Sequence, residues 1–295
     1  MFSAMDICDP KDAVELVAVL EGLGYERFWT TEHHGTGFQS ASPTLLAGIL
    51  AGRTSRIRVG TAAVLLSLYS PLKVLEDFRL LELVFPGRVD LGVASGLPAQ
   101  PYLDALADGR TSIGGEEYLG KVEELAAFTR GQEVHDIDPK SVGPYSGREC
   151  PLWLCGLSIG SAKFAGRLGI AFSYHHHLGG NRDGSAITRA YVEAFEPSPQ
   201  LEAPRFNVAC YGVCAKNTEA ATQRWQRYVA STKLLPDSSE IPPVSFLGGP
   251  DECAAQLRTI RELYRTDELV LQSLAPEYEA RVESHMMLDT VRHKV

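Results

Sequence analysis

The chain alternates short β-like runs with amphipathic helical runs, and this alternation constrains its fold more than any other feature of the sequence. The β-like runs are rich in apolar residues, and apolar residues at helical spacing follow them. Eight such runs can be recognised, at residues 2–6, 27–31, 56–66, 88–94, 151–155, 170–174, 206–215 and 268–272. Parallel strands joined by crossover helices are the simplest arrangement for this order.

The helices between these runs carry recognisable start and stop signals. Ser42 followed by Pro43 is typical of a helix start. We expect helices over residues 12–23, 43–53, 71–85, 116–129, 160–168, 185–195, 217–230 and 250–264, and a last one from residue 276. The stretch 234–248 is rich in Pro and Ser and is expected to be a loop, which could be a lid or an ordinary surface loop.

These elements predict an α/β protein with a single (β/α)8 barrel, the TIM-barrel fold, over residues 1–295. A length of 295 residues fits one such barrel, and no shift in composition marks a domain boundary. A doubly wound open sheet is the alternative. That fold usually carries a glycine-rich turn after its first strand, and this sequence has none there.

The charge and composition exclude several classes of partner. A formal net charge of −9 argues against nucleic acid or an anionic membrane, because binding either one needs a basic surface. No apolar run is long enough to span a bilayer, and the N-terminal residues do not resemble a secretory signal, so we expect a cytoplasmic protein. The six cysteines form no CxxC pair and are interpreted as reduced thiols.

In a barrel of this kind the active site lies at the carboxyl ends of the strands, so the residues after each strand are the candidates. Small and polar residues gather at these positions. They are Glu32, His33 and His34 after the second strand, Ala62 and Ala63 after the third, Ser95 after the fourth, Leu157, Ser158 and Ser161 after the fifth, and His175, His176 and His177 at the sixth.

Each group has a structural interpretation beside the functional one. Residues 155–163 suit a phosphate, because small residues and hydroxyls surround a helix start, yet Ser158 could serve only as a helix cap. His33 could act as a general base or could hold loop backbone. His175 and His177 would share one face of an extended segment, but no late Asp or Glu completes a ligand set, so no metal is expected.

Several motifs resemble a known family. Residues 24–96 contain EHH, TSRIRVG, YSPLKV and FPGRVDLG in order. This part resembles the bacterial-luciferase-like flavin-dependent monooxygenases densely, and the rest does so more weakly. The resemblance implies a (β/α)8 barrel, usually a homodimer, that uses reduced FMN from a separate flavin reductase to oxygenate a small or medium organic substrate. Some relatives use the deazaflavin F420 instead, and the family context suggests secondary metabolism.

The resemblance also assigns roles to the first two groups of candidates. His33, between Glu32 and His34, corresponds to a catalytic histidine near the flavin and the substrate. Ala62 and Ala63 correspond to a dipeptide that packs under the flavin ring and is often joined by a non-prolyl cis bond.

The later candidates receive roles in the same way. Ser158 and Ser161, together with the Leu157 backbone, correspond to the loop that binds the flavin phosphate. His176 and His177 correspond to a histidine pair near the substrate mouth in one subgroup of the family.

One departure bears on the cofactor. Close relatives carry an arginine after the fourth strand that grips the flavin phosphate, and this chain has Ser95 there. Serine does not supply the charge of an arginine–phosphate pair. Three alternatives remain open. FMN binds weakly as a reduced, substrate-like cofactor; Arg110 or Lys163 replaces the missing charge; or the chain has lost flavin and is a non-catalytic subunit or a non-redox enzyme.

Two further features concern partners and substrate. The helix around residues 72–85 has an apolar face that either packs on a second copy of the chain or only faces the barrel. The loops 97–115, 131–150 and 234–248 are expected to set the substrate, whose identity the sequence does not encode in readable form.

Overall fold

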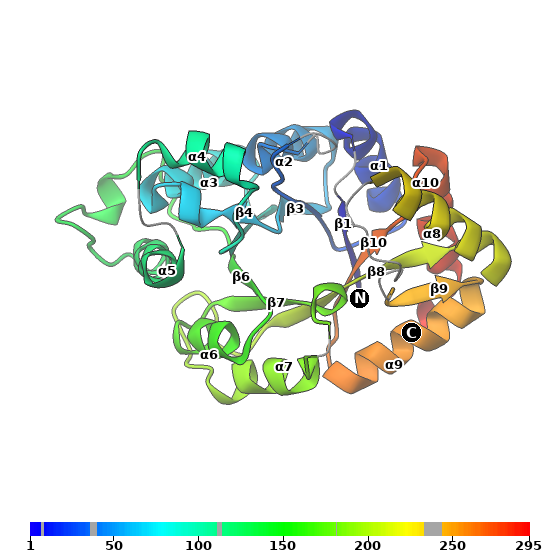
Figure 1. Ribbon diagram of the computed structural model, residues 1–295. Coiled ribbons are helices and arrows are strands. Elements are labelled where there is room, and N and C mark those ends of the chain that lie inside the picture. Colours follow the sequence, from blue (N-terminus) through cyan, green and yellow to red (C-terminus); the bar gives the residue numbers. More distant parts are fainter. Residues whose placement is uncertain (7–8, 36–39, 111–113, 181, 233–243) are drawn as a thin grey trace.

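A closed barrel of parallel strands forms the centre of the protein (Figure 1). The computed structural model describes residues 1–6, 9–35, 40–110, 114–180, 182–232 and 244–295. The barrel strands are β1 (Phe2–Asp6), β2 (Arg27–Thr30), β3 (Arg58–Thr61), β5 (Val89–Ala94), β6 (Leu152–Gly156), β7 (Ala171–His175), β8 (Phe206–Cys214) and β10 (Leu269–Ser273). Each pairs in parallel with the next, and β10 closes the ring by pairing with both β8 and β1. The predicted (β/α)8 barrel is confirmed.

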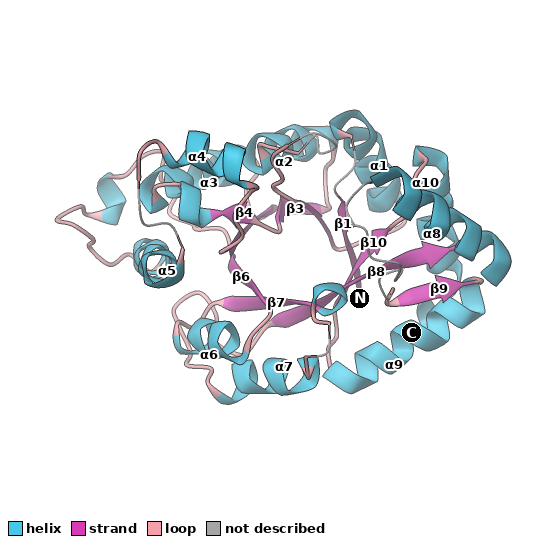
Figure 2. Cartoon of the chain, in the orientation of Figure 1, coloured by secondary structure: helices cyan, strands magenta, loops and turns pink. Residues whose placement is uncertain are grey.

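Helices form an outer ring around these strands (Figure 2). They are α1 (Pro10–Gly22), α2 (Pro43–Arg53), α3 (Pro71–Val84), α4 (Gln100–Ala107), α5 (Gly115–Thr129), α6 (Ile159–Arg167), α7 (Gly184–Glu193), α8 (Thr218–Thr232), α9 (Pro250–Tyr264) and α10 (Tyr278–Thr290). Short 3-10 turns occur at η1 (Leu66–Leu68), η2 (Pro139–Ser141), η3 (His176–Leu178) and η4 (Arg292–Lys294). Within the described ranges, no helix has the length and apolarity that crossing a bilayer requires.

The structure corrects three details of the predicted elements. The run 56–66 is not one strand, because a cis peptide bond between Ala62 and Ala63 separates β3 from the short β4 (Val64–Leu65), which pairs with β5. The segment 97–115, expected as a loop, contains α4. Part of the expected loop 234–248 is a strand, β9 (Phe246–Gly248), because the buried Phe246 pairs with β8. Residues 233–243, and with them the question of a lid, lie outside the described residues.

The core has one layer between strands and helices and another inside the barrel. In α1, for example, Leu16, Val17 and Leu20 are fully buried against the strands. Inside the barrel, the indole rings of Trp29 and Trp153 meet edge to face with their centroids 5.1 Å apart. The five described cysteines, which include the buried pair Cys210 and Cys214, form no disulfide bond.

A buried arginine organises the end of the barrel where the strands begin. The Arg27 side chain is fully buried on β2 and donates to Asp90 Oδ2 on β5 at 2.7 Å and to both carboxylate oxygens of Glu268, just before β10. Arg58 on β3 also donates to Asp90, through Nη2 at 2.6 Å. Burial alone would raise the pKa of Asp90, but the charges of Arg27 and Arg58 outweigh it and hold the pKa below its usual value.

We expect Asp90→Asn to destabilise the protein strongly, because it leaves the buried Arg27 charge without its full partner. Breaking a buried ion pair from one side costs about 3–5 kcal/mol. The measurement is urea unfolding followed by circular dichroism. Asp251→Asn is the matched control, since Asp251 pairs with Lys294 on the surface at 2.6 Å and its loss should leave the unfolding midpoint nearly unchanged. Equal effects of the two variants would contradict the role given to the buried network.

Candidate active site

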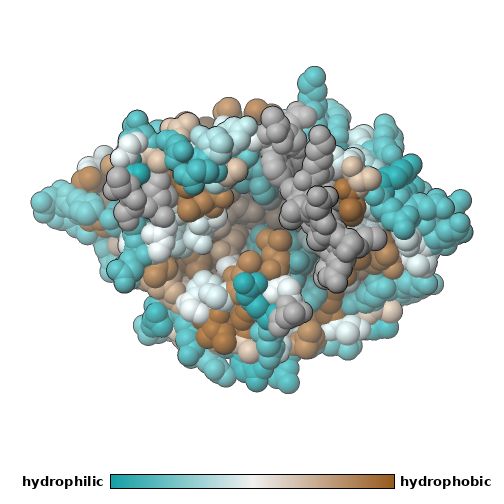
Figure 3. Space-filling view, in the orientation of Figure 1, coloured by the Kyte–Doolittle hydropathy of each residue, from teal (hydrophilic) through white to brown (hydrophobic). Residues whose placement is uncertain are grey.

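A cavity of ≈ 650 Å³ opens at the carboxyl ends of the barrel strands. Its wall receives residues from the segments that follow β2, β3, β5, β6 and β7, and from β1, β8, β10 and α8. Figure 3 shows this face, with apolar side chains around the central hollow. The cavity therefore lies where the fold predicts a site, and most of the sequence-predicted candidates line it.

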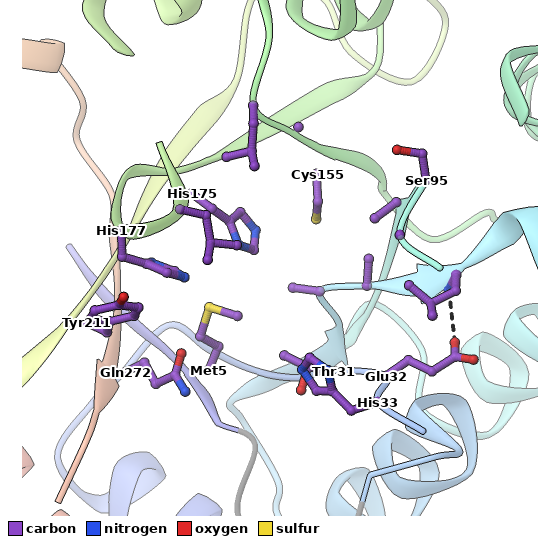
Figure 4. A pocket seen from close by; sticks show the side chains of 18 of the residues that line it. Met5, Thr31, Glu32, His33, Ser95, Cys155, His175, His177, Tyr211 and Gln272 are labelled. Carbon is purple, nitrogen blue, oxygen red and sulfur yellow. Dashed lines mark hydrogen bonds between the residues drawn. The ribbon is translucent and has the colours of Figure 1, made fainter. Parts of the chain in front are cut away.

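The Glu32 carboxylate is a structural hub of the segment that follows β2. It accepts hydrogen bonds from the backbone N–H of Leu65 at 2.9 Å and from the Tyr69 hydroxyl at 2.6 Å, and its Oε1 lies 2.8 Å from His34 Nε2. Figure 4 shows the bond to the Leu65 backbone. With three partners, this buried carboxylate ties the end of β2 to the segment after β3. The backbone N–H of His33 donates to the Ser40 carbonyl at 2.9 Å.

His33 and His34 face different surroundings. His33 lies in the cavity wall, whereas His34 is bonded to Glu32 and does not line the cavity. Burial, and secondarily the neighbouring His34, lowers the pKa of His33. A neutral imidazole in a cavity wall can accept or donate a proton near neutral pH. Of the predicted catalytic group, His33 and Glu32 therefore line the cavity, whereas His34 lies outside it and is bonded to Glu32.

The segment after β3 forms one side of the cavity. Ala62 and Ala63 line it and are joined by a cis peptide bond. The Thr61 hydroxyl donates to the Gly92 carbonyl at 2.9 Å and accepts from the Gly92 N–H at 3.1 Å, which fixes this segment on β5. A Cβ at position 92 would collide with the Thr61 carbonyl oxygen, so only glycine permits the approach.

The predicted phosphate loop lies at the N-terminus of α6. Ser158 Oγ accepts from the Ser161 N–H at 3.1 Å, and Ser161 Oγ accepts from the Ser158 N–H at 3.2 Å, a reciprocal capping box. Leu157, Ser158 and Ser161 all line the cavity. Ser158 therefore does cap the helix, and the same residues also face the cavity, so the two interpretations of this motif are compatible.

The structure shows which cationic side chains line the cavity. Ser95 lines the cavity and is exposed, while Arg110 and Lys163, the suggested substitutes for the missing arginine, do not line it. Arg110 instead donates to backbone carbonyls of α4 and η1, among them Leu68 O at 2.8 Å. Among the described residues in the wall, the single Lys or Arg is Arg182, from the segment after β7, which lies between β6 and β8. Its Nη1 donates to the Gly179 carbonyl at 3.2 Å.

The three histidines stand at the end of β7 and in the 3-10 turn η3 that follows it, and they face different surroundings. His175 and His177 line the cavity, while His176 points away and its Nδ1 lies 2.8 Å from the Tyr264 hydroxyl. His177 Nδ1 donates to the Ala209 carbonyl at 3.2 Å. Burial lowers the pKa of His175 to about 4 and that of His177 well below its usual value, so both are neutral at pH 7. The position of His176 is a correction to its predicted place at the substrate mouth.

Some wall residues were missed from the sequence. Tyr211 on β8, Trp225 on α8 and Gln272 on β10 line the cavity together with Arg182. Tyr211 lies two residues after Ala209, which faces the barrel interior, on a strand that the sequence predicts, so strand periodicity could have found it. Arg182 carries no comparable signal, because it lies in an irregular segment. Within the described part of the chain, no group of three His, Cys, Asp or Glu residues could hold a metal ion.

Comparisons with known proteins agree with this architecture. The sequence profile of the luciferase-like monooxygenases matches residues 4–266. A protein of Escherichia coli strain K12 named luciferase-like monooxygenase is 31% identical over 311 residues, covering 96% of this chain and 91% of its own. The N-acetyl-S-alkylcysteine monooxygenase of Bacillus subtilis strain 168 is 31% identical over 256 residues, covering 85% of this chain and 74% of its own.

Solved structures extend the comparison. The crystal structure of apo-MsnO8 superimposes with a TM-score of 0.87 at 28% identity, covering 100% of this chain and 98% of that one. The fold is shared by an F420-dependent secondary alcohol dehydrogenase, with a TM-score of 0.72 at 15% identity, covering 100% of this chain and 98% of that one. It is also shared by the FMN complex of the oxygenating constituent of 3,6-diketocamphane monooxygenase from Pseudomonas putida. That structure has a TM-score of 0.69 at 15% identity, covering 100% of this chain and 97% of its own. On the strength of the profile match and these relatives, the chain belongs to the family of luciferase-like monooxygenases.

Proposed function

We propose that this chain is a monooxygenase that binds reduced FMN in the barrel cavity and oxygenates a small or medium organic substrate. The observation that carries the proposal is that three separate motifs line one cavity. They are the Ala62–Ala63 pair, the Ser158–Ser161 loop and His33. The names of the relatives support oxygen transfer, since two of them at 31% identity are monooxygenases.

The residues present fit a flavin phosphate at α6. The first turn of a helix leaves backbone N–H groups without intrahelical partners, and an anion is stabilised there. A Cβ at Gly156 would lie 2.5 Å from Ser161 Oγ, so glycine lets the loop fold closely over the helix start. Arg182 is the cation that we assign to this phosphate in place of the arginine that Ser95 replaces.

The chain's own residues would orient the reactants and exclude water. A bound reduced flavin supplies the two electrons and the activation of O2 that oxygen transfer requires. The apolar wall, with Leu154, Leu157 and Leu274, keeps water away from the ring. His33, neutral at pH 7 and with its backbone N–H bonded to the Ser40 carbonyl, would receive or return a proton at its imidazole nitrogen. A separate flavin reductase would deliver the cofactor.

A titration with reduced FMN under anaerobic conditions tests the cofactor, and Arg182→Gln tests the phosphate contact. We expect FMN to bind with a micromolar Kd, about −8 kcal/mol. Losing a charged hydrogen bond of about 1.5–3 kcal/mol should raise that Kd by roughly 10- to 150-fold in the variant. Riboflavin, which lacks the phosphate, should bind wild type and variant equally.

Arg189→Gln is the control, because Arg189 is exposed on α7 and does not line the cavity. A Kd for FMN that Arg182→Gln leaves unchanged would refute the assignment of Arg182. If F420 binds tightly and FMN weakly, the proposed function would change from a monooxygenase to an F420-dependent oxidoreductase. No binding of any flavin would favour a flavin-free barrel.

We expect His33→Ala to lower turnover by about 10²- to 10⁴-fold, the usual contribution of a general acid or base. Turnover is measured as ¹⁸O transferred from O2 to product. Because burial lowers the pKa of His33, the neutral form persists as the pH falls through 6.5, and wild-type turnover should decline only below that value. A large fall in melting temperature with little change in turnover per folded molecule would show a structural role instead.

We also propose a homodimer through α2 and α3. Leu45 and Ile49 on α2 and Leu80, Leu83 and Val84 on α3 are between 48% and 69% exposed, and these two helices are in contact. Leu80→Glu should convert the dimer to a monomer in light scattering, because a charge in an apolar interface loses its water. Leu263→Glu, at an exposed leucine of α9, is the control and should leave the dimer intact.

A further inference from the structure

This inference rests on the proposed function and concerns the part of the cavity that a flavin would leave open. Figure 4 shows His177 and Tyr211 on the side away from Glu32 and Ser95. The Ala62–Ala63 pair and the phosphate loop belong to the flavin by the argument above. The opposite side is therefore the place for the organic substrate, and its wall should match that substrate.

Three aromatic residues, Tyr211 on β8 with Trp225 and Tyr228 on α8, form this wall, which we call the aromatic wall. The rings of Tyr211 and Trp225 have centroids 6.4 Å apart and planes inclined by 32°. Those of Trp225 and Tyr228 are 5.9 Å apart and inclined by 19°. His177 lies against Tyr211 at 4.2 Å with an angle of 37°. Trp225 and Tyr228 are stacked on each other and Tyr211 is tilted against Trp225, so the aromatic wall is a continuous row of aromatic rings.

The aromatic wall carries no net charge. Glu32 and Arg182 are the ionised side chains among the described residues that line the cavity. Glu32 is occupied by its three partners, and Arg182 is assigned to the phosphate. Burial keeps His175 and His177 neutral at pH 7. A charged substrate would find no counter-ion beside the aromatic rings and would lose its water on entry.

Two polar groups lie beside the aromatic wall. Gln272 on β10 lines the cavity near Tyr211 and presents an amide, which both donates and accepts hydrogen bonds (Figure 4). The His175 ring lies in the cavity wall with 8% of the residue exposed, and its Nε2 has no hydrogen-bond partner among the described residues. Since Nε2 is itself covered, His175 adds a neutral ring to the wall, and Gln272 is the group that offers hydrogen bonds to a ligand.

We propose that the aromatic wall binds a planar, uncharged aromatic substrate that carries a hydroxyl or carbonyl group, with its ring stacked on Tyr211 and its oxygen at Gln272. Flat rings gain from offset stacking on aromatic side chains, and an alicyclic or aliphatic molecule of the same size gains only from burial. The wall therefore selects for planarity as well as for apolarity.

The test compares four probes by calorimetry in the absence of flavin. They are 2-naphthol, its saturated counterpart 2-decalol, naphthalene and 1-decanol. We expect 2-naphthol to bind about tenfold more tightly than either saturated alcohol, because stacking adds to burial. Tyr211→Leu should remove most of that preference while leaving the affinity for 2-decalol within about twofold. Gln272→Leu should remove the preference for 2-naphthol over naphthalene.

Tyr145→Leu is the control, because Tyr145 is 42% exposed and lies outside the cavity. Trp225 is nearly buried, so replacing it would also affect folding. The test therefore uses variants of Tyr211 and Gln272 instead. Equal affinity for 2-naphthol and 2-decalol, or tighter binding of 1-decanol, would overturn the proposal. If the protein prefers 2-naphthol but binds no flavin, the proposal for the aromatic wall would be supported and the proposed monooxygenase function would be refuted.

Discussion

The barrel depends on a single buried guanidinium. Arg27 reaches from β2 to Asp90 on β5 and to Glu268 before β10, so one side chain joins strands that are not neighbours across the inside of the ring. The same guanidinium lies 5.6 Å from the Trp29 ring centre and 5.2 Å from that of Trp153. These partners fix where the strands begin relative to one another. They therefore also fix the level at which the strands end, and the cavity lies at that level.

This arrangement separates stability from chemistry along the barrel axis. The ionic network and the two tryptophans occupy the end where strands begin, and the cavity occupies the end where they stop. The segments after the strands can therefore vary without disturbing the network. Ser95 lies in such a segment, so the residue at this position can alter the charge of the cavity wall without changing the strands.

The strands and the order of the barrel could be predicted because their apolar runs are short, buried and separated by helical periodicity. His33, Ser158 and His175 could be placed because each directly follows or ends a strand. Sequence position could not place Arg110 correctly, since its guanidinium is held by backbone carbonyls that only the folded chain brings near. Nor could it find the pairing of Tyr211 with Trp225, which depends on how α8 packs over β8.

The reciprocal hydrogen bonds between Ser158 and Ser161 have a consequence for how the proposed cofactor would bind. Each hydroxyl already satisfies a backbone N–H of the other residue, so the loop has its shape before any anion arrives. A binding loop that already has its bound shape loses little conformational entropy when a ligand binds, and it does not rearrange when the ligand leaves. Under the proposed function, this loop would therefore receive the phosphate of reduced FMN and release that of oxidised FMN without changing its shape.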